Sequence, residues 1–105
     1  MDNVKKLYAQ HVWLDKLVRD LREFPCVDGV FIFGSRTQAK HAKFADVDLA
    51  IVCPHASIYE WQEMLDIIDN ADTLLRIDCV RYDKIVDKKF KDEIDRTKKV
   101  LYAKN

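Results

Sequence analysis

The sequence lacks the features that mark several large classes of protein. It has 105 residues but only two glycines, two prolines and three cysteines, and its formal net charge is zero. No apolar run approaches the roughly 20 residues that a membrane-spanning helix needs. The first residues, MDNVKKLYAQ, contain no apolar core of the kind found in signal peptides. We therefore expect a cytoplasmic chain with no membrane association.

The charge balance argues against a general nucleic-acid-binding function. Lysine and arginine number 18, aspartate and glutamate also number 18, and the sequence pI is about 6.8. A chain without net positive charge has no long-range attraction for a phosphate backbone. We expect no direct binding to DNA, although a small local basic patch is compatible with these numbers.

The cysteine pattern argues against a disulfide framework and a zinc site. Cys26, Cys53 and Cys79 are odd in number, widely spaced and without a CxxC motif. Cys53 and Cys79 lie inside apolar runs, which is typical of buried thiols. Free thiols of this kind fit a reducing cytoplasm.

Apolar spacing predicts alternating helices and strands. A helical pattern runs from residue 3 to about residue 23 and ends at Pro25. Continuous apolar runs predict buried strands over residues 28–34, 46–53 and 74–80.

Two further helices are predicted beside these strands. Ser57 and Glu60 have the form of a capping box, and the helix that they begin would place four apolar residues on one face: Ile58, Trp61, Leu65 and Ile68. A last helix is predicted from about residue 83 or 87 to Leu101, with Val86, Phe90 and Ile94 in its apolar stripe. This order indicates one α/β (α+β) domain over residues 1–105, with a small three- to four-stranded sheet flanked by helices.

The end of the first predicted strand is a candidate anion site. Gly34 ends this strand and is followed by Ser35 and Arg36. A glycine lets the backbone approach a ligand closely, and the N–H groups of a helix beginning at residue 35 would point at the same place. Lys40 and Lys43 would add positive charge. A tight turn capped by Ser35 is the alternative.

Two carboxylates at the start of the second predicted strand are a candidate cation site. Asp46 and Asp48 alternate with Val47, so both acids project from the same face of the strand. Like charges this close repel each other unless a cation lies between them, and oxygen ligands suit Mg²⁺. A solvated strand end is the alternative. It explains Asp46 better than Asp48, because the apolar run LAIVC follows Asp48 directly.

Asp78 is the third acid of this predicted site. It interrupts the apolar run LLRIDCV, where a buried strand would favour a hydrophobic residue. If strands 46–53 and 74–80 are neighbours, Asp78 can lie beside Asp46 and Asp48, and three such acids can hold two metal ions for phosphoryl or nucleotidyl transfer. The alternative is an ion pair between Asp78 and Arg76 or Arg81.

These residues together resemble a known family. Gly34-Ser35, ten intervening residues and Asp46-Val47-Asp48 reproduce the GS-x10-DxD signature of the polymerase-β-like nucleotidyltransferases. The short length and the stretch GSRTQAKHAKFADVDLAIV look like the minimal nucleotidyltransferase (MNT) branch, whose members are commonly paired with HEPN-domain toxins. The resemblance implies the polymerase-β-like fold.

The resemblance also implies a role for each motif residue. Gly34, Ser35 and Arg36 would bind the nucleoside triphosphate, while Asp46, Asp48 and Asp78 would ligate Mg²⁺, with two ions expected. Asp78 would in addition help to deprotonate the acceptor hydroxyl. The implied reaction is the transfer of AMP from ATP to a tyrosine of a partner HEPN toxin, which silences that RNase, so that the chain acts as an antitoxin.

Two alternatives to this reaction stay open. The chain could be an antitoxin without catalysis that neutralises a HEPN partner by binding alone, although a pure binder has no need of three clustered acids. It could also be an enzyme of the same fold with a small-molecule or RNA acceptor. The short chain leaves little room for an acceptor-holding domain, which favours an acceptor on a partner protein.

Overall fold

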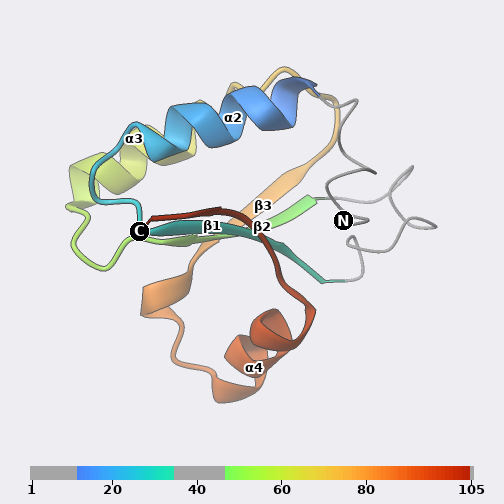
Figure 1. The fold of residues 1–105 in the computed structure, drawn as a ribbon. Helices are drawn as coiled ribbons and strands as arrows, with labels where there is room; N and C mark the ends of the chain where they lie inside the picture. Colours follow the sequence, from blue (N-terminus) through green and yellow to red (C-terminus); the bar gives the residue numbers. More distant parts are fainter. Residues whose placement is uncertain (1–11, 35–46, 105) are drawn as a thin grey trace.

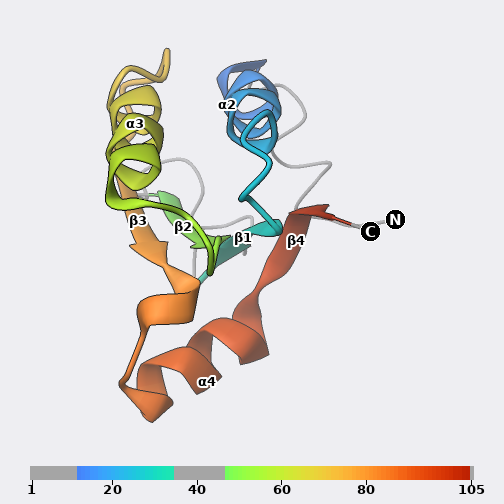
Figure 2. The same ribbon diagram turned by 90° about the vertical axis from the view of Figure 1, so that its left-hand side faces the viewer.

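The described part of the chain, residues 12–34 and 47–104 of a computed structural model, forms a four-stranded sheet with helices on both faces (Figure 1). In chain order its elements are α2 (Val12–Arg22), β1 (Gly29–Phe33), β2 (Val47–Val52), α3 (Ile58–Asp69), β3 (Ile77–Arg81), the 3₁₀ helix η3 (Tyr82–Lys84), α4 (Lys88–Thr97) and β4 (Lys99–Ala103). Figure 2 shows α2 and α3 on one face of the sheet and α4 on the other. The predicted α+β class is confirmed.

The sheet is mixed, and its strand order is β3-β2-β1-β4. Strand β1 is antiparallel to both of its neighbours, whereas β2 and β3 are parallel and are connected by the crossover helix α3. The parallel register places Asp48 of β2 opposite Asp78 of β3. The antiparallel register places Phe33, the last residue of β1, opposite the same Asp48. Three strands therefore meet around Asp48 at one end of the sheet.

Alternation along the strands divides the core between the two faces. The larger cluster lies under α2 and α3 and contains Leu14, Leu17, Leu21, Val30, Ile32, Val47, Leu49, Ile51, Met64 and Ile68. The smaller cluster lies under α4 and contains Phe31, Phe33, Ala50 and Ile94. Since side chains alternate between the two faces, Asp48 projects to the same face as Ala50, which is the α4 face.

The helices begin and pack largely as their sequences predict. In α2 the buried residues Leu14, Leu17 and Leu21 recur at helical spacing. At the start of α3, the Glu60 N–H donates to Ser57 Oγ at 3.1 Å and the Ser57 N–H donates to Glu60 Oε1 at 2.8 Å, which confirms the capping box. No helix in the described ranges is both long and apolar enough to span a membrane.

The largest departure from the sequence-based prediction is at the C-terminal end. The predicted helix to Leu101 is wrong, because α4 ends at Thr97 and residues Lys99–Ala103 form strand β4. Lys98 has an extended backbone (φ −65°, ψ 147°), which directs the chain back along β1. Strand β4 pairs with the open edge of β1 and so satisfies the backbone N–H and C=O groups of that edge. A longer helix would have left these groups of β1 without partners in the sheet.

Smaller differences affect the ends and faces of elements. Strand β3 begins at Ile77 rather than residue 74, and Leu74 is fully exposed. On α3 the buried residues are Met64 and Ile68, whereas Ile58 is exposed. Val86 precedes α4 and is also exposed, so it is not part of that helix's apolar stripe. Residues 3–11 of the first predicted helix lie outside the described residues.

All three cysteines are free thiols in the structure. Cys53 is fully buried, as predicted, whereas Cys26 and Cys79 are only half-buried. Burial raises the pKa of Cys53 to about 11 and the pKa of Cys79 to about 12. Both thiols are therefore protonated at neutral pH, which makes them structural residues rather than nucleophiles.

An ion pair with little solvent exposure ties β3 to the loop after β2. Arg81 Nε donates to Asp83 Oδ2 at 3.1 Å, and both side chains are 15% exposed. The Arg81 guanidinium also donates to the carbonyls of Cys53 and Ala56, at 3.0 and 2.9 Å. The Cys53 N–H in turn donates to Asp83 Oδ1 at 2.7 Å. This network holds the segment that leads into α3.

Candidate nucleotidyl-transfer site

The candidate site lies where β1 ends and where β2 and β3 begin. Asp48 is the second residue of β2, Asp78 is the second residue of β3, and the two are register partners. Neighbouring strands lie about 4.8 Å apart, and register partners project to the same face, so the two carboxylates lie side by side on the α4 face. The adjacency on which the predicted role of Asp78 depended is therefore present. Both side chains are half-buried.

Gly34 brings the end of β1 against the Asp48 carboxylate. A Cβ atom built on Gly34 would lie 3.1 Å from Asp48 Oδ2. Within residues 12–34 and 47–104, Gly34 is also the only residue with a positive φ, +82°. Glycine adopts this conformation at no steric cost, whereas other residues are strained there. Both the conformation and the close approach therefore require glycine at this position.

Replacement of Gly34 by alanine tests this requirement. We expect Gly34→Ala to lower the free energy of unfolding by about 1–2 kcal/mol, because of the left-handed backbone and the contact with Asp48. The other glycine is the matched control, because a Cβ on Gly29 meets its nearest atom, the Tyr102 carbonyl oxygen, at an ordinary 3.4 Å. Urea unfolding measures both variants, and an equal loss of stability in the two would contradict the assignment.

Asp78 also makes an ion pair. Arg76 Nε lies 3.1 Å from Asp78 Oδ1, and their side chains are 73% and 45% exposed. The sequence left open whether Asp78 would pair with Arg76 or with Arg81. The structure shows the pair with Arg76, whereas Arg81 pairs with Asp83. Exposed pairs contribute about 0–1 kcal/mol, so this contact is weak enough to be exchanged for another cation.

The remaining predicted site residues are not placed by the structure. Ser35, Arg36 and Asp46 lie outside the described residues, as do Lys40 and Lys43. Among the described residues, no group of three or more His, Cys, Asp or Glu side chains could hold a metal ion. The described part of the site thus supplies two carboxylates, Asp48 and Asp78. As adjacent hard oxygen donors at a partly exposed sheet end, they fit Mg²⁺ in chemistry and position.

Thr97 is a residue of this site that the sequence analysis missed. Its hydroxyl oxygen accepts a hydrogen bond from the Gly34 N–H at 2.9 Å, although the two residues are 63 positions apart. Nothing in the local sequence indicates this contact, because it depends on how α4 returns to the end of β1. The site therefore includes the last residue of α4.

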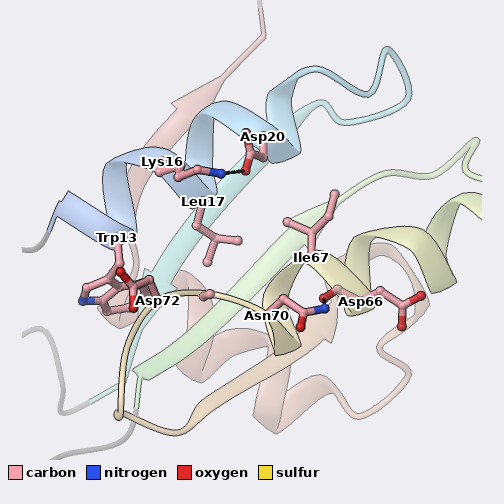
Figure 3. Close-up of a pocket in the computed structure, with 9 residues that line it drawn as sticks. Trp13, Lys16, Leu17, Asp20, Asp66, Ile67, Asn70 and Asp72 are labelled. Carbon is pink, nitrogen blue, oxygen red and sulfur yellow. Dashed lines mark hydrogen bonds and ion pairs between the residues drawn. The ribbon is translucent and has the colours of Figure 1, made fainter.

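A separate pocket of about 340 Å³ lies between α2 and α3 (Figure 3). Its lining combines apolar and charged side chains from Trp13, Lys16, Leu17, Asp20, Asp66, Ile67, Asn70, Ala71 and Asp72. Lys16 Nζ lies 2.9 Å from Asp20 Oδ2, one turn further along α2. Because these helices cover the face of the sheet opposite Asp48 and Asp78, the pocket is not part of the candidate site.

Comparisons with solved structures find the same fold. One match is a crystal structure of the toxin–antitoxin MntA–HepT, with a TM-score of 0.58, 18% identity, and coverage of 90% of this chain and 73% of the other. A toxin–antitoxin structure with AMP-PNP has a TM-score of 0.60, 18% identity, and coverage of 91% and 75%. A third is a tri-AMPylated Shewanella oneidensis HEPN toxin in complex with MNT antitoxin, with a TM-score of 0.52, 20% identity, and coverage of 86% and 66%.

Comparisons of sequence give the family. A search of curated proteins found no match. The family model described as "Polymerase beta, Nucleotidyltransferase" matches residues 15–105, which include Gly34, Asp48, Asp78 and Thr97. The chain therefore belongs to the polymerase beta nucleotidyltransferase family.

Proposed function

We propose that this chain is a Mg²⁺-dependent nucleotidyltransferase that transfers AMP from ATP to a tyrosine hydroxyl of a HEPN-domain toxin and thereby acts as its antitoxin. The observation that carries the proposal is the pairing of Asp48 with Asp78 across two parallel strands, with Gly34 against the Asp48 carboxylate. Family membership supports nucleotidyl transfer. Structural neighbours with AMP-PNP and with an AMPylated HEPN toxin support the nucleotide and the partner.

Each site residue has a role in this proposal. Asp48 and Asp78, together with Asp46, would hold Mg²⁺, and Gly34, Ser35 and Arg36 would bind the triphosphate. Gly34 suits this role because it carries no side chain beside Asp48, so a phosphate can approach the backbone closely. Mg²⁺ held by these carboxylates would neutralise charge on the phosphates and on the leaving group.

The proposed reaction is an in-line displacement at the α-phosphorus of ATP. The tyrosine oxygen of the partner forms a new P–O bond, the bond between the α-phosphorus and the bridging oxygen breaks, and pyrophosphate leaves with that oxygen. The phenolic proton leaves the tyrosine, and Asp78 is the base that we assign to it. Asp78 fits this role because it is partly exposed at the sheet end, where an acceptor on another protein can reach it.

This assignment has consequences for location and partners. ATP and Mg²⁺ are cytoplasmic reactants, and free thiols fit the same reducing compartment. We therefore place the reaction in the cytoplasm. The partner supplies the acceptor, and a chain with a net charge of zero has no long-range attraction for DNA.

An intact-mass experiment tests the proposal. The chain is incubated with ATP, Mg²⁺ and the protein encoded by the adjacent gene, and the mass of that protein is measured. We expect a gain of one or more AMP units that requires Mg²⁺ and is lost with Asp46→Asn or Asp78→Asn. Full inhibition of the partner without any mass change, also by the Asp variants, would instead identify a binding-only antitoxin.

The Arg76–Asp78 pair gives a prediction about Mg²⁺. In Arg76→Gln a positive charge beside Asp78 is removed, so we expect Mg²⁺ to bind up to about fivefold more tightly, as about 1 kcal/mol of repulsion at 4 Å in water allows. Stability should change by less than about 0.5 kcal/mol, because the pair is exposed. Half-saturating Mg²⁺ in the transfer assay and urea unfolding measure the two effects. Weaker Mg²⁺ binding in this variant would show that Arg76 assists the site rather than competes with the metal.

A further inference from the structure

The hydroxyl of Thr97 connects the last turn of α4 to the end of β1. Its oxygen accepts the hydrogen bond from the Gly34 N–H at 2.9 Å. The same hydroxyl donates to the Glu93 carbonyl at 2.8 Å, one turn earlier in α4. Because its proton is committed to Glu93, its lone pairs remain for Gly34. The bond to Glu93 therefore fixes the hydroxyl proton, and the hydroxyl oxygen faces the Gly34 N–H at the candidate site.

Helix α4, which carries Thr97, is held in place by core packing and by an N-terminal cap. Ile94 is fully buried in the cluster under α4, and the ring of Phe90 lies 5.9 Å from the ring of Phe33 in an edge-to-face arrangement. The Asp87 side chain caps the N-terminus of the helix, with its Oδ1 accepting from the N–H groups of Lys89 and Phe90. A helix that is packed and capped in this way holds Thr97 at a defined position relative to the sheet.

The Gly34 backbone in turn lies close to the Asp48 carboxylate. A Cβ atom added to Gly34 would lie 3.1 Å from Asp48 Oδ2, so the carboxylate lies close to the Gly34 backbone, and a displacement of Gly34 would change the space between them. We infer that Thr97 is a positioning residue for nucleotidyl transfer. It holds the end of β1, through the Gly34 N–H, at a fixed position beside the Asp48 carboxylate that would bind the metal. This inference rests on the proposed function.

The two glycines of the sequence make the contact directly measurable. Protein labelled only at glycine with the NMR-active nitrogen isotope gives one amide signal from Gly34 and one from Gly29. Gly29 lies at the start of β1 and serves as the internal control. In Thr97→Val, which keeps the shape but loses the hydroxyl, we expect the Gly34 signal to shift and its hydrogen exchange to accelerate at least about tenfold, as the loss of about 1.4 kcal/mol of protection requires. The Gly29 signal should not shift, and Thr97→Ser should restore the Gly34 signal to its wild-type position.

Catalysis gives the second readout. We expect Thr97→Val to lower kcat for AMP transfer about 10- to 100-fold, as changes to residues that orient a metal site do, and Thr97→Ser to recover most of this loss. The matched control is Thr73→Val. Thr73 Oγ1 also accepts a hydrogen bond from a backbone N–H, that of Leu75 at 3.1 Å, but it lies in the loop after α3. Thr73→Val should keep the wild-type kcat.

The two readouts separate failure of this inference from failure of the proposed function. If the wild-type chain transfers no AMP, the proposed function fails, and the Gly34 signal still reports whether Thr97 holds the peptide. If transfer occurs, an unmoved Gly34 signal or a wild-type kcat in Thr97→Val overturns the positioning role. An equal fall of kcat in Thr73→Val would also overturn it, because the loss would then reflect general destabilisation.

Discussion

Replacing Asp48 with asparagine is expected to reduce AMP transfer at least about a hundredfold while the fold remains intact, because it removes a proposed ligand of the Mg²⁺ ion, which would supply several kcal/mol of charge stabilisation. The substitution keeps the size of the side chain and removes its charge. Asp48 faces Asp78 across the β2–β3 pair, so without metal the neutral side chain also relieves a repulsion between two carboxylates. We therefore expect the melting temperature to stay the same or to rise. Transfer kinetics with the partner and thermal unfolding measure the two effects.

A matched substitution on the other face of the sheet controls this experiment. Asp66 lines the pocket between α2 and α3, and Asp66→Asn removes one negative charge in the same way. It should retain the wild-type rate of transfer. A wild-type rate in Asp48→Asn would show that the carboxylate pair is not the catalytic site. A loss of rate in Asp66→Asn equal to that in Asp48→Asn would show that net charge, rather than position, controls the activity.

The largest effect on stability is expected for Arg81→Met. This change leaves the carboxylate of Asp83, which is only 15% exposed, without its cation, and removes two hydrogen bonds to the carbonyls of Cys53 and Ala56. Breaking a buried pair by removing one partner costs about 3–5 kcal/mol. At the size of this chain such a loss should lower the melting temperature by more than about 10 °C. Urea and thermal unfolding measure it.

Two further variants test the cause of this loss. Within the part of the chain that the structure describes, Arg96 makes an exposed ion pair with Glu93 and no other, so Arg96→Met should change stability by less than about 0.5 kcal/mol. The double variant Arg81→Met, Asp83→Asn has no unpaired carboxylate at position 83, so we expect it to recover part of the stability lost in Arg81→Met. If Arg81→Met proves no more harmful than Arg96→Met, the network does not hold the segment after β2.

Local sequence signals predicted those parts of the fold that depend on neighbouring residues. The capping box of Ser57 and Glu60, the buried runs of β1 and β2 and the spacing of Leu14, Leu17 and Leu21 all act within a few residues. Strand β4 was missed for the opposite reason. Its sequence KVLYA continues an apolar pattern that also suits a helix, and only the open edge of β1, about 70 residues earlier, makes it a strand.

The site shows the same division between local and distant causes. The alternation of Asp46 and Asp48 is a local pattern, and it predicted a cation site at the start of β2. The placement of Asp78 beside Asp48 depended on β2 and β3 being neighbours, which a single sequence leaves conditional. Thr97 could not be predicted, because its hydrogen bond to Gly34 arises only after α4 has packed on the sheet.

A turnover measurement distinguishes catalysis by this chain from inhibition by binding alone. A small amount of the chain is mixed with a large molar excess of the proposed HEPN partner, ATP and Mg²⁺, and the modified partner molecules are counted by intact mass over time. We expect each molecule of the chain to modify many partner molecules and Asp48→Asn to modify almost none. Inhibition that requires one chain for each partner molecule, with no AMP on any of them, would contradict it.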